Sequence, residues 1–263
     1  MSTLDARVLD ATRRQLGLVA LLVALAVFAW WSTIRSMGDM AASPGTDLGG
    51  LGWFVGVWIV MMAAMMLPAV SPTVALYARM TRERGLARPF AFTGGYLVVW
   101  GAAGFAAYVL FAAGKHVLGP DLAWHSGGRW FAGGLLVAAA VYELTPLKDV
   151  CLGKCRSPFG FLLGTWRDGA RGAAEMGAKH GSWCLGCCWA LMVALFALGV
   201  MSLVWMAFVA ALIAIEKLLP WQRVATLAIT ALLIALAVLM FAAPHALPGL
   251  TIPGSDMSGT MTM

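Results

Sequence analysis

The chain has 263 residues, of which 61% are hydrophobic and only 11% are charged. This composition excludes a water-soluble globular domain and is typical of a protein that crosses a membrane several times. The formal net charge of +6 at pH 7 therefore bears on the orientation of the loops, and we expect no nucleic-acid partner.

Seven apolar runs along the chain are each close to the length of about 20 residues that a helix needs to cross a bilayer. The stretch from Cys184 to Leu219 is apolar throughout. As one helix it would be about 54 Å long, which is too long for a hydrocarbon core of about 30 Å. We therefore expect a turn at 199–202 and two short helices there. The predicted spans are residues 16–34, 51–69, 90–113, 129–147, 183–199, 202–219 and 222–242.

Basic residues indicate how the spans are oriented, because cytoplasmic loops are enriched in Lys and Arg. The segment before the first run and the loops after the second, fourth and sixth runs are the basic ones. They fall on one side of the membrane only if there are seven spans, with the N-terminus cytoplasmic and the C-terminus extracytoplasmic. We interpret the first run as an uncleaved helix, because no cleavage site stands out before Arg35. The chain is thus predicted to be a multi-pass protein of the cell (inner) membrane.

The expected fold class is all-α, a polytopic membrane helix bundle. Residues 1–15 would form a cytoplasmic N-terminal segment, 16–243 the integral membrane domain, and 244–263 a disordered, Met-rich extracytoplasmic tail. Between the fourth and fifth spans, apolar residues from Phe159 to Lys179 recur at three- and four-residue steps. That pattern predicts an amphipathic helix on the inner membrane surface, with a solvated Gly-rich loop as the alternative.

A block of four methionines lies inside the second apolar run, at Met61, Met62, Met65 and Met66. Their spacing places the thioethers in neighbouring columns on one side of a helix. Prolines follow the block, and each removes a helical hydrogen bond and frees the carbonyl four residues back. Methionine is also a flexible apolar filler, but thioethers beside opened backbone suit a soft cation. We therefore treat the four as candidate metal ligands.

Five cysteines form two clusters, Cys151 and Cys155 in CLGKC and Cys184, Cys187 and Cys188 in CLGCC. The first cluster closes the fourth run and the second opens the fifth, so both are expected at the cytoplasmic face. The reducing cytosol argues against structural disulfides. Spacings of three and four residues suit two ligands presented to one metal.

The expected site is a four-thiolate site made by the two spaced pairs of cysteines, with Cys188 or His180 as an alternative ligand. Cys184 and Cys187 are expected at a helix N-terminus, where the dipole favours the thiolate. The alternative, a small buried hydrophobe, explains Cys188 well and the paired spacings poorly.

Glu143 is the other candidate ligand, because it lies inside the fourth run and intramembrane carboxylates are functional candidates by default. Glu216 and Lys217 lie at a similar depth on the sixth run. A structural ion pair or hydrogen-bonded contact between helices is therefore the competing interpretation of Glu143.

Three strings carry a resemblance: MMAAMMLPAVSP, YELTPLKDVCLGKCRSP and GSWCLGCCWALM. They resemble the signature segments of a bacterial family of predicted metal-binding integral membrane proteins of unknown function, over about residues 15–242. The resemblance implies that the cysteines, the methionine block, Glu143 and the prolines belong to the family pattern. It supplies no mechanism.

Thiolates and thioethers together select Cu(I), whereas thiolates alone also suit Zn. The leading hypothesis is a Cu(I) transporter or membrane loading factor, in which outer methionines such as Met37 and Met40 collect the ion. One alternative is a non-catalytic assembly or scaffold subunit with a structural metal, and another is a membrane thiol–disulfide oxidoreductase. An enzyme is the less favoured class. The expected partners are the lipid bilayer, a soft metal ion, a metallochaperone or metalloenzyme, and a second copy of the chain.

Overall fold

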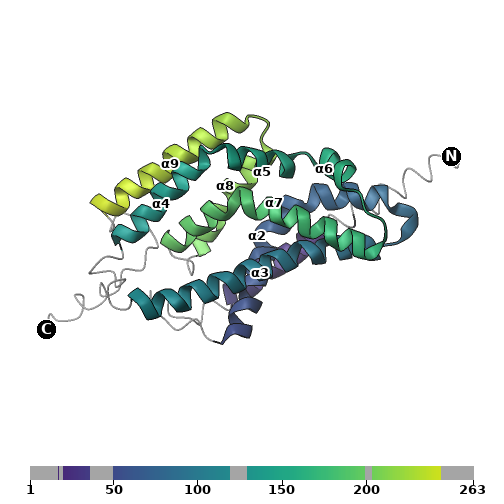
Figure 1. Ribbon diagram of the computed structural model, residues 1–263, viewed down its shortest axis with the longest axis horizontal. Helices are drawn as coiled ribbons and strands as arrows, with labels where there is room; N and C mark the ends of the chain where they lie inside the picture. The colour runs from purple at the N-terminus through teal and green to yellow at the C-terminus, as the bar shows by residue number, and fades with distance from the viewer. Residues whose placement is uncertain (1–16, 18–19, 36–49, 119–128, 199–202, 244–263) are drawn as a thin grey trace. The chain divides into compact units, whose positions relative to one another are not determined.

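The structure is a computed structural model that describes residues 17, 20–35, 50–118, 129–198 and 203–243 (Figure 1). Within these residues every regular element is a helix, which confirms the all-α prediction. The predicted terminal segments, the outer methionines and the turn at 199–202 lie outside the described residues. The elements are the helix Ala20–Arg35, α2 (Leu51–Met80), η1 (Arg82–Arg84), α3 (Ala87–Leu118), α4 (Arg129–Glu143), α5 (Pro146–Arg156), α6 (Pro158–Thr165), α7 (Gly169–Leu198), α8 (Leu203–Leu218) and α9 (Gln222–Ala242).

Three of the described helices are long and apolar enough to cross a membrane, namely α2, α3 over Ala87–Gly114, and α9. The helix Ala20–Arg35 is apolar but shorter. The chain divides into two compact units, which we describe separately. The first unit is Met1–Ile34, Gly52–Phe105 and Asp149–Cys187, and the second is Arg35–Leu51, Ala106–Lys148 and Cys188–Met263.

In the first unit, α3 packs closely against both α2 and α7. Trp58 on α2 donates its indole N–H to the backbone carbonyl of Trp100 on α3, at 2.9 Å. A Cβ added at Gly104 would overlap the Trp58 ring, so α3 needs a glycine there. On α7, a Cβ at Gly177 would overlap the Phe92 carbonyl oxygen. Glycine therefore lets the backbones of α3 and α7 approach, as in other close helix contacts of membrane proteins.

Replacing Gly177 with alanine is expected to destabilise the folded protein by about 1–3 kcal/mol, because the added methyl group must push two helix backbones apart. Thermal unfolding of the detergent-solubilised protein would measure the loss. Gly94→Ala on α3 is the matched control, because a Cβ there meets no atom within 4 Å. Equal melting temperatures for the two variants would contradict the close approach.

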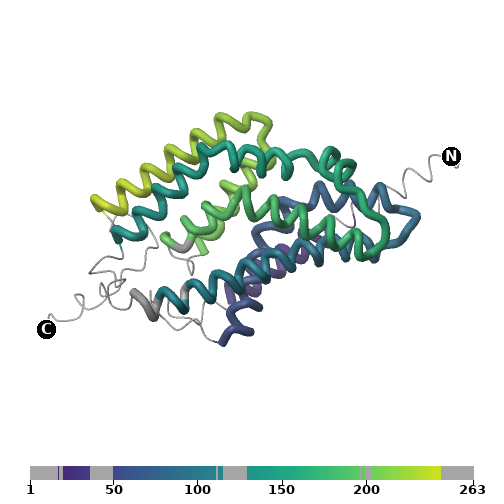
Figure 2. The backbone as a smooth tube through the Cα atoms, in the orientation of Figure 1, coloured from purple at the N-terminus to yellow at the C-terminus, as the bar shows by residue number. Residues whose placement is uncertain are grey.

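In the second unit, α4 and α9 lie side by side along their lengths (Figure 1 and Figure 2). Phe241, near the end of α9, stacks on Trp130 at the start of α4 with ring centroids 5.2 Å apart. A Cβ at Gly133 would overlap the same Phe241 ring. The end of one helix therefore meets the start of the other, and the pair is antiparallel.

Several predicted helix boundaries are wrong, and proline explains one of them. The predicted fourth span continued through Pro146, but α4 ends at Glu143 and α5 begins at Pro146. Proline disfavours helical backbone at the residue before it and cannot donate to the preceding turn. The Thr145 hydroxyl donates to the carbonyl of Tyr142 at 2.7 Å, which satisfies the acceptor that Pro146 leaves open.

The predicted amphipathic helix over 159–179 is also wrong as a single surface element. Its first half is the short helix α6, and its second half belongs to α7, which runs on into the predicted fifth span. The residues between α6 and α7 are Trp166, Arg167 and Asp168, and Gly169 then has φ of 83°. This left-handed conformation favours glycine and separates the two helices.

Candidate metal centre

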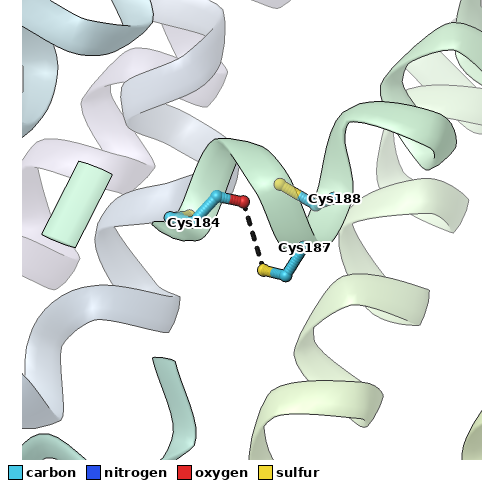
Figure 3. Close-up of side chains that lie close together, drawn as sticks. All are labelled: Cys184, Cys187 and Cys188. Atoms are coloured by element: carbon cyan, nitrogen blue, oxygen red, sulfur yellow. Dashed lines mark hydrogen bonds between the residues drawn. The ribbon is translucent and has the colours of Figure 1, made fainter. Parts of the chain in front are cut away.

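The helix α7 presents three cysteines on neighbouring turns, at positions i, i+3 and i+4. The sulfur atoms of Cys184, Cys187 and Cys188 all lie within 4.8 Å of one another. The three residues are only 1%, 2% and 1% exposed. Figure 3 shows the three side chains on this single helix, with the Cys187 thiol donating to the Cys184 carbonyl oxygen at 3.1 Å. Helical periodicity alone therefore brings these thiols together.

The separation of these sulfurs fits a single soft ion. Metal–sulfur bonds of about 2.3 Å place three sulfurs around one ion about 4.0 Å apart. The sulfurs of the cluster therefore need to approach one another by at most roughly 0.8 Å to share one ion. Buried thiols also exclude water from the ion, and their softness selects Cu(I) over hard cations.

A fourth thiol approaches this group from α5. The sulfur atoms of Cys187 and Cys155 are 3.8 Å apart, close to the separation of about 3.8 Å expected for two sulfurs on one tetrahedral ion. Cys151 lies one helical turn before Cys155, and its sulfur would be 2.7 Å from a Cβ added at Gly186. None of the five cysteines forms a disulfide in the structure. The two predicted clusters therefore meet at Cys187.

The predicted helix-dipole effect on the cysteines is wrong. Cys184 and Cys187 lie in the middle of α7, which begins at Gly169, so no helix N-terminus is close to them. Burial raises the pKa of the Cys151 thiol above its ordinary value, and the neighbouring Cys187 raises it further. Binding of a metal at Cys151 would therefore displace a proton, since the metal ligand is the thiolate.

Tyr96 is a neighbour of the site that sequence reasoning missed. Its hydroxyl lies 3.0 Å from the Cys184 sulfur, where either atom can donate the hydrogen bond. Tyr96 belongs to α3, 88 residues before Cys184 in the chain, and both residues are buried. No spacing rule links residues so far apart, so only the packing of α3 on α7 could show this contact.

His180 lies one turn before Cys184 on α7 and is buried. Its ring packs against Phe92, Tyr96 and Phe161, with ring centroids 6.1, 6.2 and 4.8 Å away. The imidazole is therefore packed among three aromatic rings. Among the described residues, the group of close ligand atoms consists of the three cysteines of α7 and does not include His180.

The four methionines of α2 are all buried, as expected for either interpretation of the block. The helix continues through Pro68 and Pro72 to Met80, whereas the predicted span ended at residue 69. Pro72 removes the hydrogen bond to the carbonyl of Pro68, and the Ser71 hydroxyl donates to that carbonyl at 2.8 Å. Pro68 and Pro72 free the carbonyls of Ala64 and Pro68, and the second of these is therefore already satisfied by a side chain.

Glu143 is paired with a cation of the chain itself. It contacts the ammonium of Lys148, which also lies 2.7 Å from Oε1 of Glu216. This buried arrangement matches the structural ion pair considered from the sequence. Because an ammonium group occupies the position beside the carboxylate, we leave Glu143 out of the candidate metal centre.

A comparison with known protein families matches residues 55–240 to PpoB2, described as a copper chaperone. No curated protein and no solved structure is similar enough to the chain to count as a match. The matched segment contains all five cysteines and the methionine block. It supports the metal-binding part of the resemblance seen in the sequence and points to copper as the metal. The match covers well over half of the chain, which therefore belongs to the PpoB2 copper chaperone family.

Proposed function

We propose that this chain is a membrane-embedded copper chaperone that binds Cu(I) through Cys184, Cys187 and Cys188, with Cys155 as the fourth ligand. The observation that carries the proposal is the group of three buried thiols within 4.8 Å of one another, in a chain of a copper chaperone family. Soft sulfur ligands in a dry setting favour Cu(I), and Zn is the competing metal. The ion is the cargo, and a metalloenzyme is the proposed recipient.

Membrane integration is part of the proposal. Large apolar side chains are exposed along α9, with Val224 65%, Leu227 61% and Val238 56% exposed. An apolar surface of this kind would be unfavourable in water and is natural against lipid. We propose seven spans with a cytoplasmic N-terminus, since that arrangement places the basic loops on one side. The thiol cluster would then lie on the side of the reducing cytoplasm.

The methionine block is proposed as a weaker copper site on the path to or from the thiols. Met61, Met62, Met65 and Met66 are buried in the first unit and need no deprotonation to bind Cu(I). A thiol–disulfide exchange protein is the second candidate, because the sulfurs of Cys155 and Cys187 are already 3.8 Å apart. Exchange would convert this pair to a disulfide during turnover.

Copper analysis of anaerobically purified protein tests the proposal. The wild type is expected to bind about one Cu(I) per chain, in keeping with a single soft-ligand site, and to retain it when excess Zn is added. Cys184→Ser/Cys187→Ser/Cys188→Ser should lose this copper because its thiols are gone. Met62→Leu/Met65→Leu, which keeps the helix apolar, should retain the thiol-bound ion.

The same preparations distinguish a copper chaperone from a thiol–disulfide exchange protein. A chaperone should have all five cysteines open to alkylation in the absence of copper. Copper should then protect the α7 thiols from alkylation. Wild-type protein without copper, or the same copper content in the triple cysteine variant, would refute the copper site. A disulfide between Cys155 and Cys187 that appears during turnover would favour exchange.

A further inference from the structure

Three ionisable side chains meet in the interior of the second unit. The Lys148 ammonium contacts Glu143 and lies 2.7 and 2.8 Å from the two carboxylate oxygens of Glu216. The side chains of Glu143, Lys148 and Glu216 are 0%, 0% and 3% exposed. With both carboxyl groups ionised, this triad would carry a net charge of one negative unit. Burial of an uncompensated charge is strongly unfavourable, so the triad favours a further positive ligand.

A buried oxygen of the triad has no hydrogen-bond partner. Glu143 Oε1 is fully buried and accepts no hydrogen bond, whereas its other oxygen contacts Lys148. Carboxylates rarely leave a buried oxygen unpaired, because the desolvation penalty is then uncompensated. Oε1 is therefore the place where a ligand of the triad would be held.

The helix α9 carries two more buried polar atoms. The hydroxyl oxygens of Thr226 and Thr230 are buried and have no hydrogen-bond partner. Gly133 of α4 lies against Phe241 of the antiparallel α9. Glu143 lies ten residues after Gly133 on α4. Ala231, the neighbour of Thr230, lies ten residues before Phe241 on α9. Equal helical rise therefore places Thr230 at the level of Glu143.

The other charged groups on these helices lie nearer the surface than the triad. Lys217 on α8 is partly exposed, and Arg223 on α9 and Asp149 on α5 are exposed. Arg129 lies at the opposite end of α4 from Glu143. Among the described residues of the second unit, the triad contains the only buried charged side chains.

We propose that the Glu143–Lys148–Glu216 triad is a proton-binding site, in which the two carboxyl groups together hold one exchangeable proton. A proton on either carboxyl group removes the excess charge and turns the protonated oxygen from an acceptor into a hydrogen-bond donor. The proton comes from water and returns to it, and no bond other than O–H forms or breaks. A metal ion is a poorer ligand here, because the ammonium of Lys148 would repel it. The inference does not depend on copper as the cargo.

Infrared spectroscopy of the full-length protein in lipid nanodiscs at neutral pH tests this site. Protonated carboxyl groups have a carbonyl stretching band that carboxylates lack, and the band shifts in D2O. We expect the band in the wild type and its loss in both Glu143→Gln and Glu216→Gln. In either variant a single carboxylate remains, and it ionises to pair with Lys148. Two independent variants guard against the failure of one to fold.

Glu175→Gln is the control, because Glu175 is a partly exposed partner of Arg167 and Arg171 outside the triad. It should keep the wild-type band. A wild type without the band, or a band that persists in both triad variants, would overturn the proposal. A band that appears only after sodium and potassium are removed would overturn it too, since a cation would then be the ligand.

Discussion

Replacing Cys187 with serine is expected to weaken Cu(I) binding more than any other single cysteine substitution in this chain. Cys187 belongs to the group of three sulfurs on α7 and also lies 3.8 Å from the Cys155 sulfur. Its loss removes one ligand and separates the α5 thiol from the rest. Mutation of a residue that merely hydrogen-bonds to a metal ligand typically lowers metal affinity by about 10–100-fold. Loss of a ligand itself should cost more, so we expect Cu(I) affinity to fall by at least about 100-fold.

Anaerobic competition with a chromophoric Cu(I) chelator would measure this loss. Cys151→Ser is the matched comparison, since Cys151 is also buried and near Cys187 but lies outside the group of three. The Cys151 variant should lose less affinity than the Cys187 variant. Equal losses, or a larger loss for Cys151, would mean that the ion is held by a different set of thiols.

Replacing Lys148 with methionine is expected to destabilise the protein by about 3–5 kcal/mol, the range for breaking a buried ion pair by removing one partner. The substitution leaves the two buried carboxyl groups of Glu143 and Glu216 close together without the ammonium between them. Thermal or denaturant unfolding in detergent would measure the loss. Lys154→Met on the same helix is the control, because Lys154 is exposed.

A second variant separates lost charge balance from lost packing. Adding Glu143→Met and Glu216→Met to Lys148→Met makes all three positions apolar at similar volume. Replacement of a buried ion cluster by well-packed apolar groups is often close to neutral in stability, so most of the lost stability should return. A Lys148→Met protein as stable as the wild type would show that the triad contributes no net free energy to folding.

Helix boundaries that coincide with a proline can be predicted well from the sequence, because a proline acts on the residues next to it. The predicted span 222–242 coincides with α9, which follows Pro220 and precedes Pro244. The predicted span 51–69 lies within α2, which extends further because Pro68 and Pro72 interrupt the apolar run without ending the helix. The hydroxyl of Ser71 satisfies the carbonyl that Pro72 opens, and the helix continues to Met80.

The candidate metal centre is only partly predictable from the sequence. The spacing of Cys184 and Cys187 already implies that they share one helix face. Cys188 is only an alternative ligand in the sequence analysis, since a small buried hydrophobic residue would explain its presence equally well. In the helix Cys188 lies four residues from Cys184 and therefore shares its face. The expected contribution of a helix N-terminus failed, since α7 starts 15 residues before Cys184.

By itself the sequence determined the helical class, the apolar segments and the spacing of the thiols on α7. These features depend on residues within a few positions of one another, where helical periodicity decides the geometry. Only the tertiary structure decided that Cys155 approaches Cys187, that Tyr96 contacts Cys184, and that Lys148 joins Glu143 to Glu216. Those contacts join residues on different helices, and they depend on close packing that no local pattern encodes.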